Sequence, residues 1–196
     1  MAFSDFTFKE IKRKFVLTEQ NENLFSNISA IPQSEWLKET LKRSLTLAYI
    51  SEKSRSEAIV MPILLELKEI CLQQIAIYSG ALLDADKEQG LNGECDFILC
   101  HSAQTNTIES PIFCMVEAKD SNIKLGLGQC TAQMLGAKVY NENENKPAKT
   151  IYGCVTTGED WQFLKLENNI IYVDIQRYYL NQLEQILGIL KYIVLQ

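Results

Sequence analysis

Three residues near the middle of the chain carry side chains that could do chemistry together. Asp96 lies early in the apolar stretch ECDFILC, and Glu117 and Lys119 close a second apolar stretch, PIFCMVEAK. Side chains of a β-strand alternate between its two faces, so Glu117 and Lys119 would project from the same face. If the two stretches are strands related as a hairpin, Asp96 comes close to Glu117. The sequence therefore predicts two carboxylates and an ammonium group gathered at the end of a buried strand.

This set of groups suits the hydrolysis of a phosphodiester. Carboxylate oxygens are hard ligands of the kind that Mg²⁺ or Mn²⁺ takes, together with waters and phosphate oxygens. We expect Asp96 and Glu117 to hold such a cation, with the backbone carbonyl of Ala118 as a further ligand. The cation would lower the pKa of a bound water and neutralise charge on the phosphate. Lys119 could orient the attacking water or help to deprotonate it.

A simpler interpretation of Glu117 and Lys119 is a solvated ion pair, which contributes little to stability. It accounts for the pair but leaves Asp96 unexplained. Other metal ligands are scarce: His101 is the only histidine, and none of the six cysteines forms a Cys-x-x-Cys pair. A site built from several histidines is therefore excluded, and a zinc site of paired cysteines has no support.

The spacing of these residues resembles the signature of the PD-(D/E)XK nuclease superfamily, which is an acidic residue, a variable gap, then Asp or Glu, any residue, and Lys. Asp96, Glu117 and Lys119 match it, and GECDF stands where the family often has Gly or Pro before its Asp. The similarity extends over roughly residues 50–160 and is closest to uncharacterised bacterial proteins and to nuclease-like modules of restriction enzymes. It implies a restriction-endonuclease-like α/β fold, with a mixed central sheet flanked by helices, and Mg²⁺- or Mn²⁺-dependent cleavage of DNA, as in an endonuclease.

The resemblance also implies supporting residues on two helices. The family often has a Glu near the start of the helix before the strands, where Glu52 matches best, Glu57 second and Glu66 third. Many members carry a Gln on the helix after the Lys strand. Gln129 takes that place, and Gln133 follows one turn later. The implied catalytic set is therefore Asp96, Glu117, Lys119, Glu52 and Gln129, with Glu52 also near the metal.

The order of the predicted elements fits an α/β or α+β sandwich around a mixed sheet. We divide the chain into an N-terminal arm and helix that pack on the core, 1–50, and a nuclease-like domain, 51–196. Pro62 predicts a kink or break in the expected helix 51–71. Gly126 and Gly128 predict a flexible start to the expected helix 125–142. The expected helices are 34–50, 51–71, 125–142 and 177–196, and the expected strands are 75–80, 94–100, 111–119, 150–158, 161–166 and 170–175, with a polar connection at 81–93.

Composition bounds the class of protein. Hydrophobic residues make up 46% of the 196 residues, which is enough for a packed core. No stretch approaches the about 18 to 20 apolar residues of a membrane span, and the N-terminus lacks the apolar centre of a secretion signal. The six cysteines lie mostly in apolar stretches, which favours buried, reduced thiols. We therefore expect a cytoplasmic protein without a membrane contact.

The net charge of −6 argues mildly against a nucleic-acid binder, because phosphate neutralisation uses Lys and Arg. A nuclease would need a local basic groove, for which five residues are near enough in sequence: Lys53, Arg55, Lys119, Lys124 and Lys138. An alternative is a catalytically idle nuclease-like fold that binds nucleic acid or a partner protein. A homodimer through the apolar C-terminal helix is compatible with either function.

Overall fold

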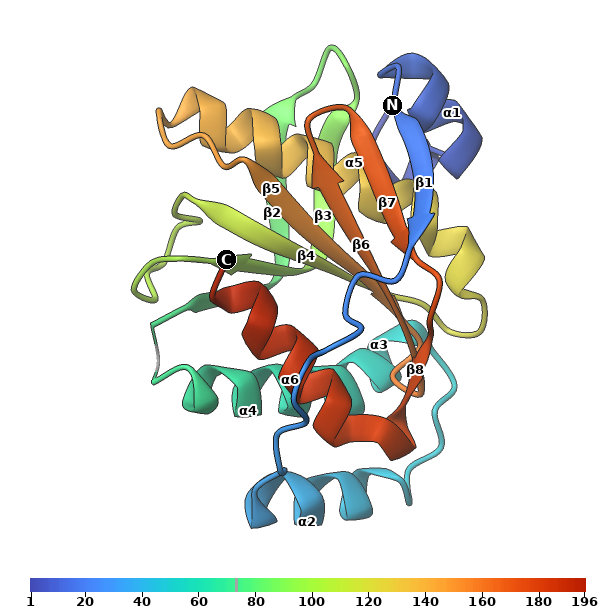
Figure 1. The fold of residues 1–196 in the computed structure, drawn as a ribbon, viewed down its shortest axis with the longest axis vertical. Helices are drawn as coiled ribbons and strands as arrows, with labels where there is room; N and C mark the ends of the chain where they lie inside the picture. Colours follow the sequence, from blue (N-terminus) through green and yellow to red (C-terminus); the bar gives the residue numbers. More distant parts are fainter. Residues whose placement is uncertain (73) are drawn as a thin grey trace.

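The computed structural model, which describes residues 1–72 and 74–196, has a mixed β-sheet with helices on both faces (Figure 1). The strands lie in the order β1-β7-β6-β5-β4-β3-β2, and β8 pairs with β6. The predicted α/β class with a flanked mixed sheet is therefore confirmed. The strands are β1 (Thr18–Glu22), β2 (Ala76–Asp86), β3 (Leu91–Cys100), β4 (Ile112–Ala118), β5 (Thr150–Thr156), β6 (Asp160–Glu167), β7 (Ile170–Asp174) and β8 (Tyr178–Tyr179).

Two strand pairs in the sheet are parallel, β4 with β5 and β1 with β7, and the other pairs are antiparallel. A parallel neighbour requires a crossover connection, usually a helix. Helix α5 (Ile123–Asn143) provides it between β4 and β5 and lies across the sheet (Figure 1). The end of β4, the start of α5 and the end of β5 consequently meet at one edge, which is where Glu117 and Lys119 were expected to act.

The helices form two layers, each with its own apolar core. Helix α5 covers one face, together with α1 (Phe8–Lys14) and a 3₁₀ turn, Phe3–Asp5, and the core beneath it includes Met115, Cys130 and Met134. The opposite core includes Phe97, Val116 and Trp161. The helices over it are α2 (Glu35–Ser44), α3 (Glu52–Arg55), α4 (Met61–Ile70) and α6 (Leu183–Val194).

Helices α3 and α4 are parts of one helical run, which begins after the N-cap residue Ser51. The Ser51 hydroxyl accepts a hydrogen bond from Ser54 N, 3.2 Å away. The run passes through a π-helical turn, Ser56–Val60, and continues as α4 with Pro62 in its first turn. Proline has no backbone N–H to donate to the preceding turn. The irregularity expected at Pro62 is therefore present as a π-turn just before α4.

Several element boundaries differ from the sequence prediction. The polar connection expected at 81–93 is largely strand, because β2 runs to Asp86 and β3 starts at Leu91, and Leu83 and Leu91 are buried. Helix α2 ends at Ser44 rather than at residue 50. Helix α6 starts at Leu183, after β8 and a 3₁₀ turn. Within the arm predicted at 1–50, β1 is a strand of the central sheet.

All six cysteines are buried and free, as the sequence predicts. Among the described residues, no helix is both long and apolar enough to cross a membrane. Helix α6 turns its apolar side chains into the protein, since Leu187, Ile189 and Ile193 are almost completely buried. A dimer through this helix would therefore have to use its remaining, more polar surface.

Candidate active site

The site begins where the ladder between β3 and β4 stops. The last paired residues are Phe97 and Val116. Beyond them, the side chain of Asp96 takes the place of a backbone acceptor: Asp96 Oδ2 accepts a hydrogen bond of 2.7 Å from Ala118 N. On the other side of β4, Lys119 N donates to Thr156 O of β5. Asp96 is thus held against the strand end that carries Glu117.

Glu117 is the most buried acidic group of the site, with 1% of its surface exposed. Its Oε1 accepts a hydrogen bond from Lys119 Nζ and its Oε2 accepts one from Gln133 Nε2, each 2.7 Å long. The pKa of Glu117 is raised to about 7, mainly by burial and in addition by the nearby carboxylate of Asp96. The pKa of Asp96 is also raised, mainly by burial. The two carboxylates therefore repel each other in a site poor in water.

Lys119 lies among three polar partners. Its Nζ is 2.7 Å from Glu117 Oε1, 3.3 Å from Gln129 Oε1 and 3.7 Å from Glu52 Oε2. Burial by itself would lower the pKa of Lys119, but the attraction of Glu117 and neighbouring carboxylates outweighs it, and the pKa is raised. Lys119 is consequently an ammonium group at neutral pH. It can donate hydrogen bonds and neutralise charge, whereas deprotonating a water, one of its two expected roles, does not fit this protonation state.

The structure distinguishes the three glutamates that the sequence offered as candidates for the supporting residue near Lys119. Glu52, on α3, is the one whose carboxylate reaches Lys119. Glu57 is exposed and pairs with Lys53 at 3.8 Å. Glu66 is buried on α4, where it accepts hydrogen bonds from both the backbone N and the hydroxyl of Ser34, each 2.7 Å long. Glu66 therefore anchors the start of α2, away from the Lys119 cluster.

The side chains of Asp96, Glu117, Lys119, Glu52 and Gln129 are thus brought together as the sequence predicts, while their catalytic and metal-binding roles stay predictions. The sequence placed Gln133 one turn after Gln129 but gave it no role in the site. Gln133 is completely buried and binds Glu117 directly, whereas Gln129 binds Lys119. The available signal was its position one turn after Gln129 on the same helix face.

The glycines at the start of α5 permit close packing rather than flexibility, since both lie within the helix. A Cβ on Gly126 would lie 2.5 Å from Val155 Cγ1 and 3.1 Å from Lys119 Cγ. A Cβ on Gly128 would lie 2.2 Å from Phe6 O. The absence of side chains at these two positions lets α5 approach the sheet edge and the stem of Lys119 closely.

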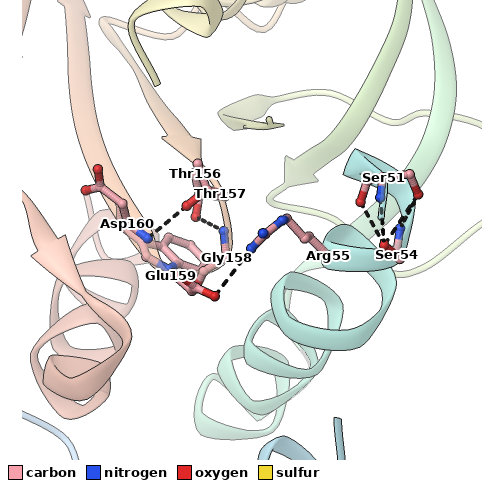
Figure 2. Close-up of polar contacts among 9 residues, drawn as sticks. Ser51, Ser54, Arg55, Thr156, Thr157, Gly158, Glu159 and Asp160 are labelled. Carbon is pink, nitrogen blue, oxygen red and sulfur yellow. Dashed lines mark hydrogen bonds and ion pairs between the residues drawn. The ribbon is translucent and has the colours of Figure 1, made fainter. Parts of the chain in front are cut away.

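The turn between β5 and β6 borders the site, and Figure 2 shows its polar contacts with the α3 region. Thr156 Oγ1 accepts from Gly158 N at 2.8 Å, and Thr157 Oγ1 accepts from Asp160 N at 3.1 Å. Arg55 Nη1 lies 3.4 Å from Glu159 Oε1 (Figure 2). Both threonine hydroxyls are therefore used within the turn, and Arg55 joins α3 to it.

The basic residues that were expected to form a groove differ in their exposure and in their distance from Lys119. Arg55 is partly buried, and Lys53 and Lys124 are exposed. Lys138 is nine residues beyond Gln129 on α5, which places it about 14 Å further along the helix axis. Lys138 therefore lies too far from Lys119 to flank the same phosphate.

The donor atoms match a hard divalent cation in kind. Asp96 and Glu117 supply carboxylates, and their mutual repulsion is one that a cation would relieve. Gln133 Oε1, beside Glu117, is buried without a hydrogen-bond partner, and a bound water or cation would satisfy it. Within residues 1–72 and 74–196, however, no group of three or more His, Cys, Asp or Glu side chains is arranged to hold a metal. Two carboxylates suffice for Mg²⁺ when waters and substrate phosphates complete its shell.

Comparison with known proteins adds no family: no protein-family model matches the chain, and no curated protein matches it.

Proposed function

We propose that the protein hydrolyses phosphodiester bonds in DNA with Mg²⁺ or Mn²⁺ as cofactor, as a nuclease of the PD-(D/E)XK type. The observation that carries this proposal is the convergence of Asp96 and Glu117 on the ammonium group of Lys119 at one strand end. Ion pairing of Glu117 and Lys119 would not need Asp96, whose nearby charge makes ionisation of Glu117 more difficult. A site that retains two such carboxylates suits a cationic ligand.

The residues have separate roles in this proposal. Asp96, Glu117 and the carbonyl of Ala118 would hold the cation, which when bound supplies charge neutralisation and a more acidic water. Lys119 is already a donor directed into the site, so it would bind a phosphate oxygen and stabilise charge as it develops in the transition state. Glu52 and Gln129 hold Lys119 from the solvent side and from α5.

Gln133 would keep the Glu117 carboxylate in a single orientation, because its amide donates to the oxygen that Lys119 does not contact. Asp96 is fixed by the Ala118 N–H in the same manner. Preorganised groups of this kind avoid the cost of reorganisation during the reaction. Strand β4 holds Glu117 rigidly, because every residue of the strand is buried.

Cleavage of supercoiled plasmid, linear duplex and single-stranded DNA tests the proposal directly. Each substrate is incubated with Mg²⁺, Mn²⁺ or EDTA and with wild type, Lys119→Met or the control Lys138→Met. We expect metal-dependent cleavage that Lys119→Met reduces about 100-fold or more, as for other lost charge-stabilising donors, and that Lys138→Met retains. Cleavage that persists in Lys119→Met would refute the proposed role of this site.

A second candidate is a nuclease-like fold that no longer cleaves and serves as a binding module. The observation in its favour is that both oxygens of Glu117 already accept hydrogen bonds from side chains of the protein itself. Calorimetric titration with Mn²⁺ separates the two functions. Absence of Mn²⁺ binding favours the idle binding module. Mn²⁺ binding without cleavage of any DNA substrate favours a nuclease that requires a partner protein, and cleavage excludes the idle fold.

A further inference from the structure

A separate cavity of about 630 Å³ lies at the opposite ends of β4 and β5 from the Lys119 cluster. Phe113 near the start of β4 and Thr150 at the start of β5 line it, together with Tyr192 near the end of α6. Figure 1 shows the C-terminal end of α6 beside β4. The volume lies within the range of small-molecule sites. The length of β4 and β5 therefore separates this cavity from the proposed hydrolytic site, and neither site depends on the other.

One part of the cavity wall is aromatic. The ring of His101 stacks on that of Phe113, with centroids 4.1 Å apart and 29° between the ring planes. Tyr152 and Tyr192 also line the cavity. Flat faces of this kind bind planar rings by stacking, with little preference among different bases.

Another part of the wall is basic. Three lysines, Lys146, Lys149 and Lys165, face one acidic side chain, Glu167. Lys149 Nζ is 3.0 Å and Lys165 Nζ is 3.7 Å from Glu167, and Lys146 donates to Ser110 O at 3.1 Å. An ammonium has three N–H donors, so each lysine keeps donors for a ligand. In a chain of net charge −6, this local excess of positive charge favours an anion.

Tyr152 adds a hydrogen-bond donor to the wall of the cavity. The residue is 93% buried, since only 7% of its surface is exposed, and it lines the cavity. Its hydroxyl makes no hydrogen bond within the described residues and is not one of the buried atoms left without a partner, so it is accessible to solvent and can donate to a ligand. Burial raises the pKa of Tyr152 to about 12, so the hydroxyl is protonated and free to donate.

From the stacked rings, the lysines and the accessible Tyr152 hydroxyl, we propose that this cavity binds a nucleotide. The base would lie against His101 and Phe113, and the phosphate would accept hydrogen bonds from Lys149 and Lys165. The Tyr152 hydroxyl would donate to the same ligand. A free nucleoside monophosphate and the phosphorylated end of a DNA strand share this chemistry, and the experiment distinguishes them.

Isothermal titration of the full chain with AMP, adenosine, inorganic phosphate and a 5′-phosphorylated DNA hexanucleotide tests the site. We expect AMP or the hexanucleotide to bind about tenfold or more tightly than adenosine or phosphate alone, because ring and anion contribute together. Preference for AMP identifies a free nucleotide, and preference for the hexanucleotide identifies a strand end. Failure of both to bind at millimolar concentration overturns the proposal.

Substitutions of residues that line the cavity test whether the ligand binds there. Lys165→Met should weaken AMP or hexanucleotide binding about tenfold by removing a charged donor, and Tyr152→Phe should weaken it severalfold by removing only the hydroxyl. Lys38→Met, at the unrelated cavity beside α2, should bind as wild type does. Circular dichroism and the unfolding midpoint confirm that each variant is folded. Unchanged affinity in both Lys165→Met and Tyr152→Phe would overturn the assignment to this cavity.

Discussion

The side-chain amide of Gln133 donates a hydrogen bond of 2.7 Å to Glu117 Oε2 inside the layer between α5 and β4. Both residues are almost completely buried, and Lys119 occupies the other oxygen of the same carboxylate. The amide of Gln133 therefore helps to keep a charged group inside the protein, where water cannot replace it.

Replacing Gln133 by Leu should reduce the free energy of unfolding by about 1 to 3 kcal/mol, because Glu117 Oε2 loses its donor while it remains buried. Gln129→Leu is the matched control on the same helix, since Gln129 is only partly buried and accepts a longer hydrogen bond from Lys119. Urea unfolding in EDTA measures both variants. Equal losses in the two would mean that the Gln133 contact has no special weight.

Glu117 should make the stability of the metal-free protein depend on pH. Its pKa is about 7 in the folded chain, above the value of 4.5 ordinary for glutamate, so the folded state binds this proton more tightly than the unfolded state. Its contribution to stability is present below pH 4.5 and is lost as the pH rises through 7. From pH 5 to pH 8, wild type should lose roughly 2.5 kcal/mol relative to Glu117→Gln.

Urea unfolding at several pH values in EDTA, with Glu117→Gln as the comparison, checks this dependence. Parallel stability profiles for wild type and Glu117→Gln would show that Glu117 titrates in the folded protein as it does in the unfolded chain.

Glu52 and Glu66 should respond in opposite ways to loss of their charge. Glu66→Gln weakens the two contacts to Ser34 at the start of α2, so stability should fall by about 1 to 2 kcal/mol with DNA cleavage retained. Glu52→Gln removes an exposed partner of Lys119, so cleavage should fall while stability changes little. Unfolding and cleavage measured on the same preparations distinguish the two, and the reverse pattern would exchange their roles.

Gly126→Ala should displace α5 or Lys119, because the new Cβ would lie 2.5 Å from Val155 Cγ1. We expect a loss of about 1 to 3 kcal/mol, despite the higher helix propensity of alanine. Val155→Ala in the same chain removes the colliding methyl groups. A double-mutant cycle should then give a favourable coupling between the two substitutions, whereas strictly additive losses would place the strain elsewhere.

The clustering of Asp96, Glu117 and Lys119 could be predicted because its determinants are local. Alternation along β4 places Glu117 and Lys119 on one face, and an antiparallel neighbour brings Asp96 to them. The roles of Gln133 and Glu66 could not be predicted, since they depend on how α5 lies over the sheet and how α2 packs against α4.

Strand β1 shows a second limit of the sequence. Its residues, TEQNE, are all exposed and polar, so no apolar alternation marks them as a strand. The segment is extended because it pairs in parallel with β7, about 150 residues further along the chain. Such a contact has no local signal, whereas the buried strands β4 and β5 were recognisable from their apolar composition.

A metal site formed by Asp96 and Glu117 is tested most directly by comparing Mn²⁺ binding to wild type and to Asp96→Asn. Electron paramagnetic resonance measures the binding. Asparagine can still accept the hydrogen bond from Ala118 N, so the variant removes the charge of Asp96 with little change in geometry. Glu94→Gln removes an exposed charge two residues away and serves as the control. We expect wild type and Glu94→Gln to bind Mn²⁺ and Asp96→Asn to bind it at least about tenfold more weakly. Equal binding by wild type and Asp96→Asn, or no binding by wild type, would contradict a metal site formed by Asp96 and Glu117.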